Sequence, residues 1–270
     1  MGLELMMIRF YDREALRNDF HAAKPFPHIV IDEFLEPDAS ERMAASYPSF
    51  EAALRHGRSF DAVNEARKVQ ITDARRFPEP VAELSQRLLS REFLEDLEQI
   101  TGIPQLLADS EYAGGGMHLT GPGGRLDVHV DFNFMEERNW HRRLNLLLYL
   151  NPDWDPAWGG ALELWDARVE RCQVVVQPKL NRAVIFETSA ISYHGVQPLR
   201  CPPSRQRLSF AVYYYTREAP ADWDGSKHST IFRSRPREKF RGHVLMPLER
   251  AKRRALPWLK RNVKRAIGRR

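Results

Sequence analysis

Three residues in the middle of the chain have the types and spacing expected of ligands for one metal ion. His129 and Asp131 flank Val130 in a stretch of strand character, where side chains at i and i+2 point to the same face. One strand end can therefore present an imidazole and a carboxylate to the same ion. Non-haem iron(II) sites use two histidines and one carboxylate and leave the opposite face open for O₂ and a cosubstrate. His194, just beyond the strand-like run 182–186, is the best candidate for the second histidine.

Arg207 and Ser209 begin a second strand-like stretch and have the types needed to bind a carboxylate. Strand alternation puts both on one face with Ala211 and Tyr213. A guanidinium binds a carboxylate through two parallel hydrogen bonds, and a hydroxyl two residues further on adds a third. This pair suits the distal carboxylate of 2-oxoglutarate. Taken alone, an arginine at a strand start is a surface residue and a His-X-Asp pattern occurs by chance, so the hypothesis rests on the combination.

Around these residues the chain resembles the iron(II)/2-oxoglutarate-dependent oxygenase superfamily, in particular its prolyl-4-hydroxylase-like branch. The likeness covers about residues 112–216 and rests on several short segments in the right order. These are His118 with its glycine turn, and the segments 129–131, 146–151, 159–164, 181–186, 194–196 and 207–209. The resemblance implies a double-stranded β-helix, or jelly roll, with His129, Asp131 and His194 as iron ligands. It also implies that Arg207 and Ser209 anchor 2-oxoglutarate and that Tyr149 hydrogen-bonds the same carboxylate.

The activity that the resemblance implies is that of a 2-oxoglutarate/iron(II)-dependent dioxygenase that hydroxylates an unactivated C–H bond. Its cofactors are Fe(2+), 2-oxoglutarate as cosubstrate and O₂, with ascorbate as a further candidate. The protein supplies binding and orientation, while the metal carries the difficult step. Because Asp131 is present where related halogenases have a small residue, hydroxylation is favoured over halogenation. The best guess for the substrate is a prolyl or other amino-acid side chain.

Two alternatives stay open. In the first, the same machinery tailors a small metabolite or a glycan or lipid intermediate. In the second, which belongs to another class, the chain is a non-catalytic jelly-roll binding module. The intact set of three ligands and Arg207 argues against the second, since a binding module has no need for all four residues.

Further residues can complete the cosubstrate pocket. Alternation from Tyr149 puts Asn145 and Leu147 on the same inward face, with Leu147 as a wall and Asn145 as a polar contact. The resemblance departs at His118, where prolyl hydroxylases commonly place a tyrosine that contacts the cosubstrate. His118 therefore has three open roles, which are a bond to 2-oxoglutarate, a contact with the substrate, or packing in the core.

The segment 132–143 follows the second ligand directly and mixes aromatic with charged residues, which is typical of a substrate-facing loop. Within it we expect Asn133, Arg138 and Trp140 to contact the substrate, and a solvated loop is the alternative. Trp165 is a further candidate for the pocket wall, with core packing as its alternative.

The elements that must position these residues change in character along the chain. Residues 24–35 predict a strand and a turn, residues 37–46 a helix that starts at Pro37-Asp38, and residues 50–78 irregular structure or a flexible loop. Apolar residues at helical spacing predict one or two helices over 81–100, and short runs separated by glycine or proline predict a β-barrel over 117–216. The expected class is α+β, a jelly-roll core with N-terminal helices packed on it and a basic C-terminal helix.

The predicted regions form one integrated domain. Residues 1–110 are a helical and strand support, residues 111–218 are the catalytic core, and residues 219–270 are a C-terminal extension whose basic helix, over 247–270, is interrupted at Pro257. A length of 270 residues with 43% hydrophobic and 29% charged residues fits one globular unit of this kind.

The basic character of the chain belongs to its C-terminal end. Residues 249–270 carry a net charge of +9, so residues 1–248 carry −4. Because the tail combines basic with apolar residues, we expect it to contact an anionic membrane surface or another polyanion. There are two alternatives. The tail is a solvated face, or it covers an acidic surface of this or a neighbouring chain. The sequence has no specific nucleic-acid motif.

We expect the protein to be cytoplasmic and to contact the membrane peripherally through the tail. Cys172 and Cys201 are too few for a disulfide framework, which favours a reducing compartment. Charged residues interrupt the apolar patch at residues 1–11, unlike in a secretory signal, and no apolar run is long enough to span a bilayer.

Overall fold

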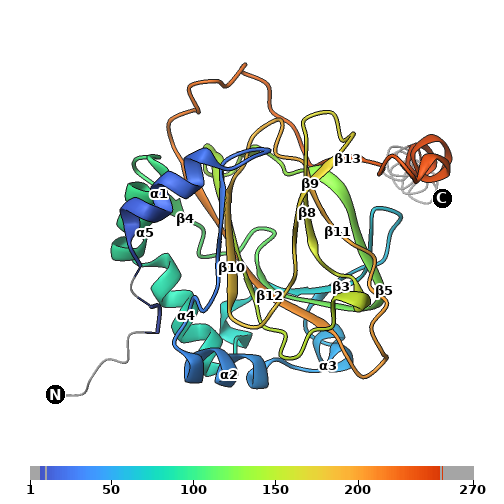
Figure 1. Cartoon of the computed structure of the whole chain (residues 1–270), viewed down its shortest axis with the longest axis horizontal. Helices are drawn as coiled ribbons and strands as arrows, with labels where there is room; N and C mark the ends of the chain where they lie inside the picture. Colours follow the sequence, from blue (N-terminus) through green and yellow to red (C-terminus); the bar gives the residue numbers. More distant parts are fainter. Residues whose placement is uncertain (1–6, 10, 250, 252–270) are drawn as a thin grey trace, which may run out of the picture.

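The computed structural model describes residues 7–9, 11–249 and 251, which form a rolled antiparallel sheet with helices packed on one side (Figure 1). The helices are α1 (Arg13–Ala22), α2 (Pro37–Ser46), α3 (Phe50–Leu54), α4 (Glu79–Leu89) and α5 (Arg91–Thr101), with shorter helical turns η1 (Ala74–Arg76), η2 (Pro156–Trp158) and the π-helical η3 (Arg241–Leu245). In Figure 1, α1, α4 and α5 lie on one side of the sheet, and η3 lies on the opposite side. No helix among the described residues combines the length and the apolar character that crossing a bilayer requires.

The described strands all belong to one sheet. They are β1 (His28–Ile31), β2 (Arg58–Phe60), β3 (Glu65–Ile71), β4 (Leu107–Ala108), β5 (Gly116–Val130), β6 (Phe134–Met135), β7 (Trp140–Tyr149), β8 (Leu162–Trp165), β9 (Cys172–Val176), β10 (Arg182–Glu187), β11 (His194–Val196), β12 (Arg207–Thr216) and β13 (Ile231–Arg233). The central path runs β1-β10-β7-β12-β5-β11-β8-β9, and its neighbours pair antiparallel. The predicted jelly-roll class is therefore confirmed.

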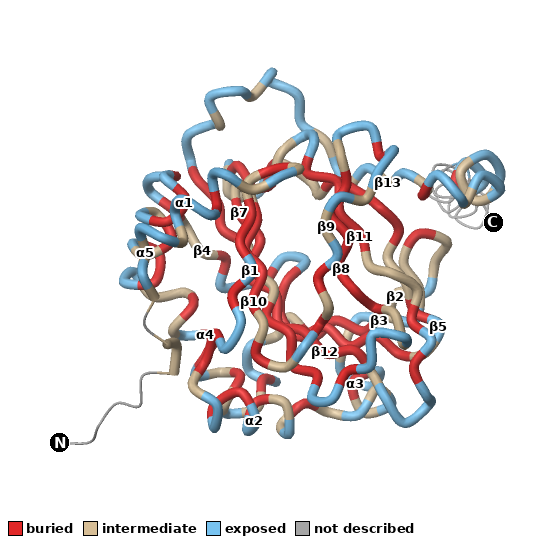
Figure 2. The backbone as a smooth tube through the Cα atoms, viewed as in Figure 1, coloured by how far each residue is buried: buried red, intermediate tan, exposed pale blue. Residues whose placement is uncertain are grey.

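The main core lies between the sheet and the helices. Strand β7 contributes Leu144, Leu146 and Leu148 to this core, and β12 contributes alternate residues such as Phe210 and Val212. Because side chains alternate along a strand, the residues between these positions point the other way, into the rolled sheet. The strands appear as largely buried segments in Figure 2, whereas the outer faces of the helices are exposed.

Helices α4 and α5 confirm the expectation for residues 81–100. The Ser90 hydroxyl accepts a hydrogen bond from the Phe93 amide, which caps the start of α5. The helix ends at Gly102, whose φ of +71° is in the left-handed region that glycine adopts readily. Leu88 and Leu97 are among the buried residues that pack the pair against the sheet.

The expectation of irregular structure over residues 50–78 was wrong. This region contains α3 and the hairpin of β2 and β3, and β3 pairs with β5 along most of its length. The polar residues of β3 have few apolar neighbours in sequence, so its strand state depends on partners that are distant along the chain.

Two further segments differ from expectation. Residues 121–124 are one of the glycine clusters of the predicted barrel, yet they lie inside β5, which continues through them with Gly123 at a φ of +79°. Strand β13, in the C-terminal extension, pairs with the end of β5 and was not predicted. Most of the basic helix predicted over residues 247–270 lies outside the described residues, although residues 246–249 are helical.

Candidate metal centre and cosubstrate pocket

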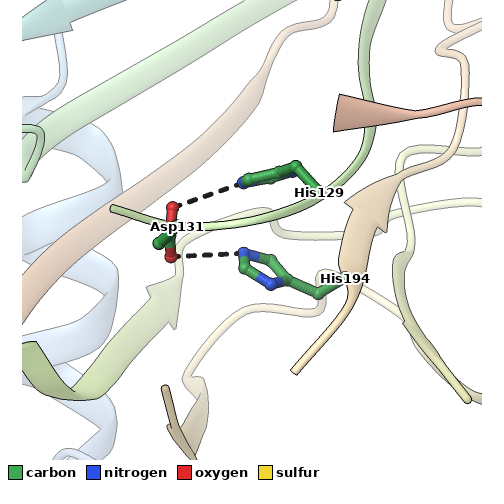
Figure 3. A group of neighbouring side chains, drawn as sticks. All are labelled: His129, Asp131 and His194. Carbon is green, nitrogen blue, oxygen red and sulfur yellow. Dashed lines mark ion pairs between the residues drawn. The ribbon is translucent and has the colours of Figure 1, made fainter. Parts of the chain in front are cut away.

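Three side chains converge where β5 and β11 meet. His194, the first residue of β11, pairs directly with His129 of β5, and Asp131 follows immediately after β5. One ligand atom from each of these residues lies within 4.8 Å of the other two. The His129 Nε2 lies 3.4 Å from Asp131 Oδ1, and the His194 Nε2 lies 3.5 Å from Oδ2 (Figure 3). The predicted ligand set is therefore brought together in one place, with the geometry of a metal centre.

Backbone carbonyls orient both imidazoles. The His129 Nδ1 lies 2.9 Å from the Asp127 carbonyl oxygen, and the His194 Nδ1 lies 3.0 Å from that of Ser192. A carbonyl only accepts, so each Nδ1 carries the proton and each Nε2 presents its lone pair to the site. Burial, with the neighbouring His129, lowers the pKa of His194 to about 4. His194 is therefore neutral at physiological pH, which is the form that binds a metal.

The carboxylate of Asp131 is held from its other side by β7. Asn145 Nδ2 donates to Asp131 Oδ2 at 2.8 Å, and Arg142 Nη2 lies 3.0 Å from the same oxygen. Burial alone would raise the pKa of Asp131, but Arg142 and the two imidazoles hold it well below its usual range. The carboxylate is therefore charged and ready to bind a cation. Asn145, predicted as a cosubstrate contact, lines the cavity and also donates to Asp131.

On the inward face of β12, Arg207 and Ser209 line the same cavity. Arg207 is only 5% exposed, and its Nε donates to the Gly160 carbonyl at 2.7 Å. Its guanidinium carbon lies 4.9 Å from the centre of the Tyr149 ring, and no carboxylate of the described residues forms an ion pair with it. The Tyr149 hydroxyl is buried without a hydrogen-bonding partner in the described part of the chain.

These groups fit the distal carboxylate of an oxoacid. A buried guanidinium needs an anion to offset the cost of its desolvation, and a buried phenol needs an acceptor. Burial lowers the pKa of Arg207 and raises that of Tyr149, and Arg207 partly offsets the rise at Tyr149. One carboxylate can satisfy both side chains, with Ser209 as a third donor.

His118 and Leu147 also line this cavity. The His118 Nε2 lies 3.1 Å from Gln70 Nε2 and 3.2 and 3.3 Å from the carbonyls of Gly114 and Gly115. Burial, together with the charges of Lys68 and Arg207, lowers the pKa of His118 well below its usual value, so the ring is neutral at physiological pH.

The cavity has a volume of about 190 Å³ and includes walls that were not predicted. Phe60, Glu65, Lys68 and Gln70 come from the β2–β3 hairpin, and Thr230 and Phe232 come from the C-terminal extension. The Phe232 ring lies 5.3 Å from that of His129. No strong sequence signal marks these residues, because both segments reach the site through strand pairing with β5.

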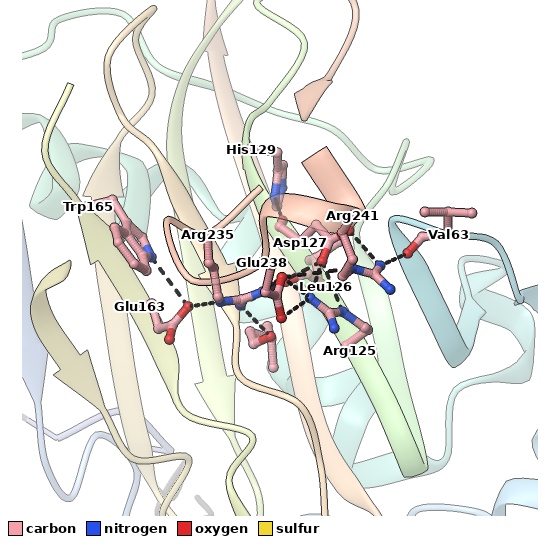
Figure 4. A network of polar contacts seen from close by, with 11 residues as sticks. Val63, Arg125, Leu126, Asp127, His129, Glu163, Trp165, Arg235, Glu238 and Arg241 are labelled. Carbon is pink, nitrogen blue, oxygen red and sulfur yellow. Dashed lines mark hydrogen bonds and ion pairs between the residues drawn. The ribbon is translucent and has the colours of Figure 1, made fainter. Parts of the chain in front are cut away.

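Charged side chains hold the C-terminal extension in place (Figure 4). Arg235 Nε donates to Glu163 Oε2 at 2.8 Å, and Arg241 Nη2 donates to the buried Asp127 Oδ2 at 2.9 Å. Arg125 bridges Asp127 and Glu238. The backbone of Asp127 also orients His129, so this charged cluster connects the extension to the metal centre.

The proposed substrate contacts lie elsewhere. Asn133 bonds the backbone of Ser226 and His228, and Arg138 lies near Asp109 and Glu111. The Trp140 ring packs 5.9 Å from that of Tyr215, and Trp165 donates to Glu163. None of the four lines the described cavity, whereas Phe132, from the same predicted segment, does.

Comparison with known proteins finds a family model that matches the region of this site. Residues 115–215 match the model of the 2OG-Fe(II) oxygenase superfamily. Over 78 residues the chain is 36% identical to prolyl 3-hydroxylase OGFOD1 of Mus musculus, a match that covers 27% of this chain and only 14% of the mouse protein. The predicted superfamily and its cofactor class, iron(II) and 2-oxoglutarate, are confirmed for this part of the chain.

Two solved structures share the fold. One is a prolyl-4-hydroxylase of Pseudomonas putida, with a TM-score of 0.55 at 18% identity, covering 75% of this chain and 99% of that one. The other is a prolyl hydroxylase from Trichoplax adhaerens in complex with a peptide fragment of the hypoxia inducible factor oxygen degradation domain. Its TM-score is 0.53 at 19% identity, and the match covers 75% of this chain and 90% of that one. At these identities the likeness establishes the fold.

Proposed function

We propose that this chain, whose residues 115–215 form a 2-oxoglutarate/iron(II) oxygenase domain, is a dioxygenase that hydroxylates an unactivated C–H bond of a prolyl or other amino-acid side chain. The observation that carries the proposal is the pairing of two sites in one cavity. A His-Asp-His metal centre lies in the same pocket as a buried arginine that has no carboxylate partner among the described residues.

The residues present fit both groups. Two imidazoles that present their Nε2 lone pairs and one charged carboxylate are the donor set that iron(II) sites use. Bound iron, with 2-oxoglutarate and O₂, supplies an oxidation in which one oxygen atom enters the substrate and the other enters succinate, with release of CO₂. His129, Asp131 and His194 would hold the metal, and Arg207, Ser209 and Tyr149 would orient the cosubstrate from its distal end.

The protein's own side chains also shape the space left for the substrate. Phe60, Phe132 and Phe232 bring aromatic groups to the cavity wall from three separate segments. Aromatic walls bury an apolar ring such as that of proline, and they help to exclude water from the reacting centre. The mouse relative, a prolyl 3-hydroxylase by name, supports the same substrate class.

The proposal is tested by turnover and by binding. Purified protein with iron(II), ascorbate and proline-containing peptides should convert 2-oxoglutarate to succinate and add one oxygen atom to the peptide, as measured by mass spectrometry. The His129→Ala variant is the matched control and should do neither. Hydroxylation of a small metabolite alone would shift the substrate class to the tailoring alternative. Failure of the wild-type protein to bind iron(II) or 2-oxoglutarate anaerobically would instead favour a binding module.

We also propose that the protein works in the cytoplasm, in peripheral contact with an anionic membrane surface. Phe240, Val244 and Leu248 are exposed at four-residue spacing, with exposed fractions of 66%, 38% and 62%. Met246 is buried and Arg241 is tied to Asp127, so the opposite side of this segment faces the body of the protein. The segment leads into the sequence of net charge +9, and an apolar stripe beside basic residues suits anionic lipid. The two free cysteines support a reducing compartment.

Vesicle binding tests the membrane contact. The full chain should sediment with vesicles that contain phosphatidylserine but not with pure phosphatidylcholine, and added salt should release it. Phe240→Asp with Leu248→Asp should reduce binding, whereas Leu54→Asp, which changes an exposed apolar residue elsewhere, should not. Binding of DNA or RNA in preference to these vesicles would contradict the lipid assignment.

A further inference from the structure

Arg142 is a fully desolvated arginine beside the metal centre. Its side chain is sandwiched between two aromatic rings, with the guanidinium carbon 3.5 Å from the centre of the Tyr213 ring and 4.7 Å from that of Phe132. The whole residue is only 3% exposed. The edge of the guanidinium is occupied as well, because Nε and Nη2 donate to Asn145 Oδ1 at 3.0 and 2.7 Å. Its orientation is therefore fixed on both faces and along one edge.

An irregularity in the β7–β12 pairing delivers Arg142 to this position. Tyr214 pairs with Leu144 and Tyr215 pairs with Arg142, so Arg143 is an extra residue on β7. Beyond this bulge the alternation of β7 is reversed. Asn145 faces the cavity, so regular alternation would point Arg143, two residues earlier, into the cavity as well. Because of the bulge, Arg142 lines the cavity in its place. Bulges next to active sites commonly re-aim a side chain in this way.

We propose that Arg142 is a positioning residue that holds the carboxylate of Asp131 in the orientation in which it would bind the metal. Arg142 and Asn145 both bind Oδ2 of Asp131, at 3.0 and 2.8 Å, and they bind each other. Both oxygens also face the imidazoles, since Oδ1 lies 3.4 Å from the His129 Nε2 and Oδ2 lies 3.5 Å from the His194 Nε2. With Oδ2 held by two donors, the carboxylate group keeps its orientation toward the two imidazoles that would share the ion with it. The inference rests on the proposed function and deepens its account of the metal centre.

The chemistry of arginine suits this role better than that of lysine. The planar guanidinium stacks between Tyr213 and Phe132 while its edge bridges Asn145 and Asp131. An ammonium group keeps the charge but lacks the plane and the forked donors. Partners of this kind, one contact removed from the metal, set ligand orientation and affinity.

The test measures metal binding and ligand geometry without turnover. Iron(II) and cobalt(II) are titrated anaerobically into wild type, Arg142→Met, Arg142→Lys and Asn145→Ala, and the visible spectrum of bound cobalt(II) reports its coordination. Arg142→Met should raise the metal dissociation constant by about 10- to 100-fold and change the cobalt spectrum. Arg142→Lys should restore little of the metal affinity, because lysine keeps the positive charge but lacks the planar, forked donors of arginine. Arg143→Met is the matched control, since Arg143 lies toward Glu187 and Thr216, and it should behave as wild type.

Each outcome bears on a different claim. If Arg142→Met binds both metals with wild-type affinity and an unchanged cobalt spectrum, Arg142 does not position Asp131. Full recovery by Arg142→Lys would show that charge alone is needed, which also overturns the positioning role. If Arg142→Met does not fold, as judged by its thermal transition, Asn145→Ala decides the question, because it removes one of the two contacts to Oδ2. A wild-type chain that binds no metal at all would refute the proposed function itself.

Discussion

Replacement of Arg207 by methionine separates two effects that point in opposite directions. Methionine is of similar length and apolar, so it fills the site without a charge. The guanidinium lies beside a phenol, and no carboxylate of the described residues pairs with it. The substitution should therefore weaken oxoacid binding and, in the absence of the oxoacid, stabilise the fold.

The magnitudes follow from the contacts. Two charge-assisted hydrogen bonds to a carboxylate contribute about 1.5–3 kcal/mol each. Their loss should weaken 2-oxoglutarate binding by at least about 100-fold, since 1.4 kcal/mol corresponds to about a factor of ten. In the ligand-free protein, removal of a buried unpaired cation relieves several kcal/mol, and loss of the bond to the Gly160 carbonyl costs about 1 kcal/mol. The expected net effect is a gain of about 1–3 kcal/mol in the free energy of unfolding.

Two assays on the same preparations measure these effects. Anaerobic titration of 2-oxoglutarate into the iron(II) protein, followed by its visible charge-transfer band, gives the dissociation constant, and urea unfolding of the ligand-free protein gives stability. Arg205→Met is the control, because Arg205 is exposed and stacks on Trp158. An Arg207→Met protein with unchanged 2-oxoglutarate affinity would refute the carboxylate assignment. Weakened binding with a loss of stability would refute the claim that Arg207 lacks a carboxylate partner among the described residues.

Three further predictions test the metal ligands, the core and the titration of buried groups. His194→Ala should abolish iron(II) binding, measured as metal content after gel filtration, while circular dichroism stays unchanged; iron retained at wild-type stoichiometry would contradict the ligand assignment. Phe210→Ala should lower the free energy of unfolding by about 3–5 kcal/mol in urea, because Phe210 is 0% exposed and packs against Phe77 and Tyr112; a loss under about 1 kcal/mol would argue against this packing. Burial raises the pKa of Tyr47 and Tyr214 well above the usual value of about 10, so folding stability should be fully present below about pH 10 and fall as the pH rises above it; urea midpoints that stay constant to about pH 11 would disagree.

Much of the site follows from local sequence because strand alternation is local. His129 and Asp131 lie two residues apart at the end of one strand, and Arg207 and Ser209 lie two residues apart at the start of another. The period of two therefore predicts correctly that each pair lines the cavity. The same period places Leu147 in the cavity wall. That these strands meet was supplied by the resemblance, since pairing between distant strands leaves no local pattern.

The parts that sequence did not reveal depend on irregular or long-range structure. Arg142 was missed because a bulge at Arg143 reverses the alternation of β7, and a bulge has no reliable signature in a single sequence. The β2–β3 hairpin was missed because it is largely polar, and β13 because it is only three residues long; the hairpin, through β3, and β13 both pair with β5. Within residues 132–143, Asn133, Arg138 and Trp140 were predicted as substrate contacts from their residue types alone. In the structure Phe132 lines the cavity and these three do not.

The pairing of β13 with β5 has a consequence for how the protein is made. On the ribosome the N-terminal residues emerge first, so all three metal ligands and Arg207 leave the exit tunnel before β13 does. Until residues 231–233 arrive, the backbone of Val128–Val130 has an unpaired edge, and Phe232 is missing from the pocket wall. Translation that stops after β12 would yield a chain with the full ligand set but an open strand edge of the kind that drives aggregation. The pocket wall and the β5 edge are therefore complete only after the C-terminal extension has been synthesised.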